Sequence, residues 1–148
     1  MSLLNRLANQ HPRDYELLIS YVVHILSVLV IKKGCIREYL YYRTPSSWLH
    51  IKLLKLLQLY PGVLMDKKRV VKPDKGKEST VNQLYQGVSK ILTETDVSDL
   101  INKSNAAHAV LFEAVNLIIC WRQTRPVQLR GGAMKLLGNC ISVREPNI

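Results

Sequence analysis

Residues 104–121 read SNAAHAVLFEAVNLIICW, the most regular apolar run in the chain. At roughly 100° per residue, the four polar side chains that interrupt it fall within an arc of about 140°; they are Asn105, His108, Glu113 and Asn116. Apolar side chains occupy the rest of the circumference, so a single neighbouring helix cannot cover them. The stretch therefore predicts a helix that is buried by more than one partner, among the most buried in the fold.

A second apolar segment, LLISYVVHILSVLVI at residues 17–31, holds 15 residues without a formal charge. A helix that spans a bilayer needs about 20, so a buried helix is the better interpretation. Its few polar side chains form one thin stripe, which predicts a satisfied structural role for His24. Pro12 suits the first turn of this helix and Gly34 can stop it.

Further helices follow from apolar periodicity and from end signals. Residues 2–9 resemble the end of a helix, Ser46 or Ser47 can cap a helix that Pro61-Gly62 ends, and another is expected at about 126–141. A one-faced amphipathic helix starts at Ser79 or Thr80, and its apolar positions are Val81, Leu84, Tyr85, Val88, Ile91 and Leu92. Residues 62–78 break the pattern with charge, Gly and Pro, and we expect a mobile loop there.

The pattern predicts an all-α fold, because no segment shows sustained strand alternation and hairpin dipeptides are absent. Helices that are buried on several sides occur beside helices with one apolar face, as in a superhelical solenoid of stacked antiparallel helix pairs. A compact bundle is the competing fold. The chain opens in an apolar helix and closes on VREPNI, so we expect a single segment, residues 1–148, truncated at both ends.

Composition restricts the function. The formal net charge of +10 favours acidic partners such as nucleic acid, an anionic membrane or an acidic protein surface. Three widely spaced cysteines without a CxxC pair argue for a reducing compartment and against a zinc site. The four histidines are isolated from one another, and no nucleophile, metal-protease or phosphate-loop motif occurs. We therefore expect no enzymatic activity, no catalytic or metal-binding residues and no cofactor.

One cluster of charge stands out, in DKKRVVKPDKGKE at residues 66–78. A basic cluster of this kind can attract anionic lipid head groups. The candidate residues are Lys67, Lys68, Arg69, Lys72, Lys75 and Lys77. Three acidic residues offset part of the charge, so a solvated loop is the alternative. Nucleic-acid binding would call for aromatic residues among the basic ones, and this stretch has none.

Two long blocks resemble the large subunits, or adaptins, of the clathrin adaptor complexes, and within them the alpha type of the plasma-membrane adaptor. The blocks are YLYYRTPSSWLHIKLLKLLQLYP at residues 39–61 and SNAAHAVLFEAVNLII at residues 104–119. The closing LGNCISVREPNI at 137–148 resembles the next repeat junction of that family. The spacing between these blocks also fits, so the resemblance covers most of the chain.

The resemblance implies a piece of the adaptin trunk, a curved stack of helix pairs similar to HEAT and armadillo repeats. Such a trunk is a scaffold in endocytic coat assembly and protein transport. Its expected partners are a second large subunit, medium and small chains and, through the whole complex, phosphoinositide membrane and clathrin. The expected location is cytoplasmic, peripheral on plasma-membrane coated pits. The alternative is a helical-repeat module that binds nucleic acid or another acidic partner, although the resemblance does not favour nucleic acid.

The resemblance transfers no functional residue, since the best-known lipid and cargo contacts of the family lie before this segment. The basic stretch at 66–78 departs from the family, in which a shorter, more acidic and proline-rich link is expected. Whether this stretch adds membrane affinity therefore stays open at the level of sequence.

Overall fold

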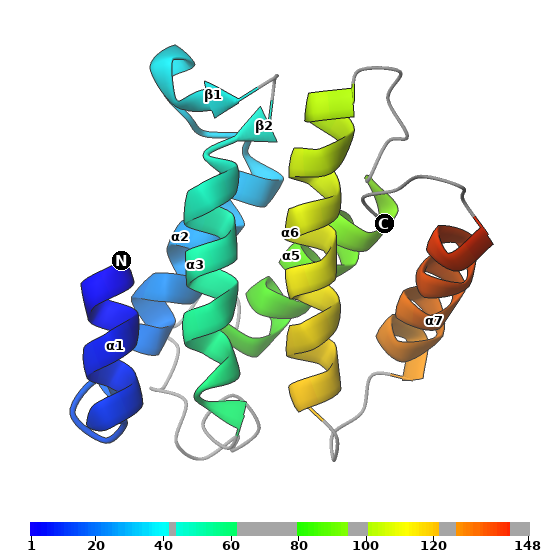
Figure 1. Cartoon of the computed structure of the whole chain (residues 1–148). Helices are drawn as coiled ribbons and strands as arrows, with labels where there is room; N and C mark the ends of the chain where they lie inside the picture. The colour runs from blue at the N-terminus through cyan, green and yellow to red at the C-terminus, as the bar shows by residue number, and fades with distance from the viewer. Residues whose placement is uncertain (42–43, 62–79, 95–100, 122–126, 143–148) are drawn as a thin grey trace.

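The computed structural model describes residues 1–41, 44–61, 80–94, 101–121 and 127–142 (Figure 1). Within these ranges the helices are α1 (Ser2–Gln10), α2 (Ile19–Ile31), α3 (Ser47–Gln58), α5 (Thr80–Thr93), α6 (Ile101–Cys120) and α7 (Val127–Ser142). Single 3-10 turns, η1 (Glu16–Leu18) and η2 (Arg37–Tyr39), precede α2 and the short strands β1 (Leu40–Tyr41) and β2 (Thr44–Pro45). The all-α prediction is confirmed.

The helices form two open layers rather than a closed bundle. In Figure 1, α1, α3 and α6 stand side by side, with α2 and α5 behind them and α7 at the far edge. The most extensive packing joins helices that are not neighbours in the chain, α2 with α5 and α3 with α6. Chain neighbours α2 and α3 run antiparallel, as do α5 and α6. This is the predicted architecture of stacked antiparallel pairs, in which each inner helix touches the repeats on both sides.

Helix α6 is covered on several sides, as its wide apolar arc predicts. It packs against α3, α5 and α7, and Leu111, Ala114 and Leu117 are fully buried. Four side chains depart from the predicted pattern. Ala109, Ile119 and Cys120, expected inside, are exposed, whereas the predicted polar stripe loses Glu113, which turns toward α3 because two polar side chains there satisfy its carboxylate.

The start and the outer face of α2 correct the sequence interpretation. The helix begins at Ile19, not at Pro12, because residues 12–15 form a turn and a 3-10 turn follows. His24 is exposed rather than buried. Helix α2 packs on α3 and α5 through its other side, which includes Val23 and Leu26. The exposed side also carries apolar residues, with Tyr21 among them. Amino-acid composition alone therefore could not show which side of α2 is exposed.

Two helix ends fall where they were predicted but are built differently. At the end of α2 the left-handed conformation is taken by Lys33, with φ 50°. Gly34 follows with its amide on the carbonyl of Val28, where a Cβ would lie 3.1 Å from a Val28 methyl group. At the start of α3, Ser46 occupies the cap position with φ 40° but makes no side-chain cap hydrogen bond. Its hydroxyl lies 3.3 Å from the sulfur of Cys35 instead.

The remaining helices agree with their patterns except at the start of α5. In α5 the positions Leu84, Val88, Ile91 and Leu92 are buried, as the amphipathic spacing predicts, and Tyr85 is half-buried, but Val81 is exposed. In α7 Ala133 is buried and Leu137 is half-buried, while the other predicted apolar side chains of that helix, at 129, 136 and 140, lie outside the described residues. The antiparallel pair of Leu40 with Pro45 was not predicted, because two residues are too few to show alternation.

Candidate functional site

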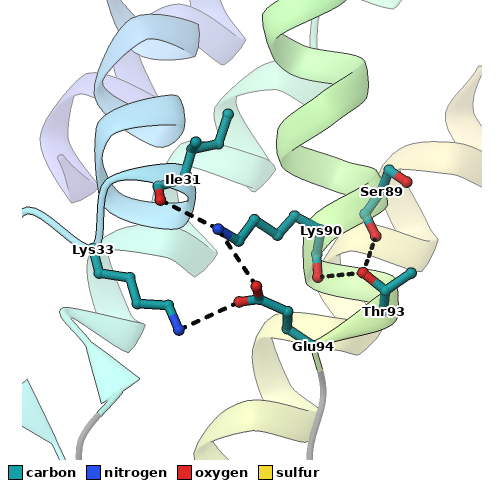
Figure 2. Close-up of polar contacts among 6 residues, drawn as sticks. All are labelled: Ile31, Lys33, Ser89, Lys90, Thr93 and Glu94. Atoms are coloured by element: carbon teal, nitrogen blue, oxygen red, sulfur yellow. Dashed lines mark hydrogen bonds and ion pairs between the residues drawn. The ribbon is translucent and has the colours of Figure 1, made fainter.

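In an array of stacked helix pairs, the contacts between one pair and the next determine the curvature of the array, and so the surface that binding partners contact. On the α2–α5 layer this contact is a polar cluster at the ends of both helices (Figure 2). The ammonium of Lys90 on α5 donates to the carbonyl oxygen of Ile31 on α2 at 3.2 Å. It also lies 3.4 Å from Glu94, whose other carboxylate oxygen is 3.5 Å from Lys33. We call these four residues the α2–α5 junction.

The α2–α5 junction provides a partner for backbone groups that the end of a helix leaves unpaired. The last carbonyl groups of a helix lack partners within the helix and carry its partial negative charge. Lys90 supplies both a donor and a positive charge to that end of α2, from the neighbouring pair. On α5 itself, the Thr93 hydroxyl bonds back to the carbonyl groups of Ser89 and Lys90 at 3.1 and 3.2 Å, in the last turn of that helix (Figure 2).

A second polar cluster joins the α3–α6 layer. The amide of Gln58 on α3 donates to the carboxylate of Glu113 on α6, and also to the Glu113 carbonyl oxygen at 3.3 Å. The Lys55 ammonium lies 3.8 Å from the same carboxylate, which is largely buried. We call these three residues the α3–α6 junction. Because a buried carboxylate needs partners, this junction holds α6 at one rotation about its axis.

Stacked helices run parallel to each other. Ile31 and Lys90 each lie in the last turn of their helix, and Trp48 near the start of α3 shares a groove with Ala106 near the start of α6. Residues 59 positions apart meet in the first junction and 55 apart in the second. No local sequence signal predicts such pairs, and sequence reasoning missed both junctions.

Buried polar groups lie inside α3 and after it. His50 is 4% exposed, and neither ring nitrogen has a hydrogen-bond partner within the described residues. Burial lowers the pKa of His50 from 6.5 to about 4, so the ring is neutral at pH 7. Burial also raises the pKa of Tyr60, and the charge of Glu16 adds to this effect. His50 shares its helix face with Leu53, Leu54 and Leu57, but α3 is apolar on more than one side, so this spacing alone did not mark His50 as buried.

The six basic residues predicted from sequence as an anionic-lipid site, positions 67 to 77, all lie outside the described residues, as does the loop expected to be mobile. Within the described ranges, His, Cys, Asp and Glu side chains nowhere gather in threes that could hold a metal ion. The helices described there include none with both the length and the apolar character to cross a bilayer.

Comparison with known proteins identifies relatives along the whole chain, although no family profile matches it. The chain is 35% identical over 147 residues to the AP-2 complex subunits alpha-1 and alpha-2 of Arabidopsis thaliana, which is 99% of this chain and 13% of either relative. It is 36% identical over 154 residues to the AP-2 complex subunit alpha-2 of Dictyostelium discoideum, which is all of this chain and 14% of that protein. The chain thus spans a small part of the length of these relatives.

Proposed function

We propose that this chain, similar over its whole length to one segment of the AP-2 alpha subunits, is a scaffold segment of a clathrin adaptor complex. Its role is mechanical and not catalytic: it holds the other subunits in place during endocytic coat assembly and protein transport. The partners are the second large, the medium and the small chains, with phosphoinositide membrane and clathrin reached through the whole complex. The place of action is the cytoplasmic side of plasma-membrane coated pits.

One observation carries this proposal, the alignment with alpha subunits over 99% of the chain. The two junctions support it physically. A scaffold must keep its curvature when partners pull on it, and polar contacts at opposite ends of the two layers resist sliding of one pair on the next. Apolar packing alone is tolerant of such shifts, whereas hydrogen bonds and ion pairs lose most of their energy with small displacements.

The test is co-purification from cells of the source organism in which the gene carries an affinity tag. We expect medium and small adaptor subunits to be recovered in stoichiometric amounts, and a fluorescent fusion to gather in plasma-membrane spots with clathrin. Recovery of nucleic acid that resists physiological salt, without adaptor subunits, would reject the scaffold role in favour of a nucleic-acid-binding module.

We also propose, from sequence alone, that the basic cluster at 67–77 adds membrane affinity. Each basic residue near an anionic leaflet contributes about 1 kcal/mol, less the effect of three neighbouring acids. Replacing Lys67, Lys68, Arg69, Lys72, Lys75 and Lys77 with Gln should weaken binding to phosphoinositide vesicles at physiological salt. Unchanged binding would reduce the cluster to a solvated insertion.

A further inference from the structure

The side of α2 that points away from the rest of the fold is largely apolar. Leu17, in the turn η1, is 74% exposed, Tyr21 is 68% exposed and Ile25 is 44% exposed. By helical rotation these side chains share an arc of about 100°, opposite the buried arc that packs on α3 and α5. We call this surface the outer stripe of α2, and its members are Leu17, Tyr21, His24, Ile25 and Val28.

The spacing of the outer stripe is that of a contact between helices. Positions 17, 21, 24 and 28 alternate steps of four and three residues, as do the positions through which paired helices interdigitate. No charged side chain interrupts residues 17–31. Contiguous apolar surface of this kind marks a site of interaction, and its shape fits another helix with an apolar face.

The outer stripe is complementary to a second copy of itself. A contact between two identical surfaces about a twofold axis requires such self-complementarity. When two copies of α2 lie antiparallel, with the axis between positions 22 and 23, position 17 of one copy meets position 28 of the other, and position 21 meets position 24. All four seam positions then have a partner, and Leu17 packs against a valine.

The charges at the two ends of the outer stripe favour this antiparallel arrangement. Residues 13–16 hold two carboxylates and one guanidinium, whereas α2 is followed by Lys32 and Lys33. Lys33 is already paired with Glu94, but Lys32 is exposed, and none of the ion pairs in the described part of the chain includes it. Antiparallel pairing brings the exposed Asp14 of one copy near Lys32 of the other. Parallel pairing would instead place like charges together and align the two helix dipoles.

We propose that two copies of this chain associate through the outer stripes of α2, antiparallel about a twofold axis. Each copy contributes one helix, so the contact buries less than the roughly 1,600 Å² of a standard interface, and we expect a dissociation constant of the order of 10 µM. Self-association is additional to the scaffold role. It does not depend on that role, and recovery of adaptor subunits from cells does not test it.

Sedimentation equilibrium of the whole chain, from about 1 to about 200 µM at physiological salt, measures the association. A reducing agent is present because Cys120 is exposed. We expect a monomer–dimer equilibrium, in which Tyr21→Lys raises the dissociation constant at least about tenfold by placing a charge in the seam. The matched control is Trp48→Lys, which removes an aromatic side chain that is also 68% exposed but lies on α3, and it should dimerise normally.

Charge reversal tests the antiparallel arrangement. Lys32→Glu should weaken the dimer at least about threefold, and the further change Asp14→Lys should restore it, because the pair re-forms with its signs exchanged. Circular dichroism confirms that each variant is folded. A monomer at every concentration, or equal association of the native chain and Tyr21→Lys, would overturn the proposal. It would also be overturned if the double variant stayed as weak as Lys32→Glu.

Discussion

Acidification should destabilise this protein in part through the buried side chain of His50. The ring is buried, and burial lowers its pKa from 6.5 to about 4. Below pH 6.5 the His50 ring therefore binds a proton in the unfolded chain but not in the folded chain. With respect to His50, the free energy of unfolding is highest above pH 6.5, falls as the pH drops, and levels off below about 4. Since one pKa unit corresponds to about 1.36 kcal/mol, the loss approaches about 3 kcal/mol.

The assay is urea unfolding at several pH values between 7.5 and about 4, for the native sequence and for His50→Leu. Leucine keeps much of the volume but cannot be protonated, so the variant retains only the pH dependence that carboxylates cause. We expect the native chain to lose about 3 kcal/mol more than the variant over this range. His24→Leu is the matched control, because His24 is exposed on α2, and it should follow the native profile.

The reasoning about His50 fails if the native chain and His50→Leu lose equal stability on acidification. It also fails if the His50 ring, followed by NMR in the folded chain, titrates near pH 6.5. A ring that takes up its proton at that pH while folded would have to be solvated, contrary to its 4% exposure.

Three further predictions concern the folded framework. Lys90→Ala should lower the free energy of unfolding by about 1 kcal/mol, measured in urea, because it removes a charged hydrogen bond that is partly exposed; an additive double change with Glu94→Ala would contradict the proposed pairing. Leu111→Ala, at a fully buried site, should cost about 2–5 kcal/mol, and a loss below 1 kcal/mol would contradict close packing of α6. Ser46→Ala should cost less than about 0.5 kcal/mol, whereas a true N-cap loses about 1 kcal/mol, so calorimetry separates the two.

The helices could be predicted because their signals are local. Spacing along α5 places Leu84, Val88 and Ile91 on one face whatever surrounds them, and burial of that face is confirmed. The wide apolar arc of α6 likewise required several neighbours, and the stacked pairs provide them. The resemblance of two sequence blocks to adaptins was equally readable, since it needs only the order of residues.

The candidate site could not be predicted in the same way. Lys90 and Glu94 look like an ordinary surface pair on one helix, and only the stacking of α5 on α2 brings the end of α2 within reach of Lys90. The groove beside Trp48 exists only because α6 presents alanines to α3. Both features are made by residues more than 50 positions apart, for which helical periodicity carries no information.

His50 and His24 show the limit of what the sequence alone predicts. The sequence by itself determined that α2 and α3 are helices, with their apolar and polar positions set by a rise and rotation that are the same in every helix. Only the tertiary structure decided that His50 is buried and His24 exposed. Both helices are apolar on more than one side, and which side is covered depends on the neighbour that packs there. Periodicity defines the faces of a helix, whereas packing between helix pairs determines which face is buried.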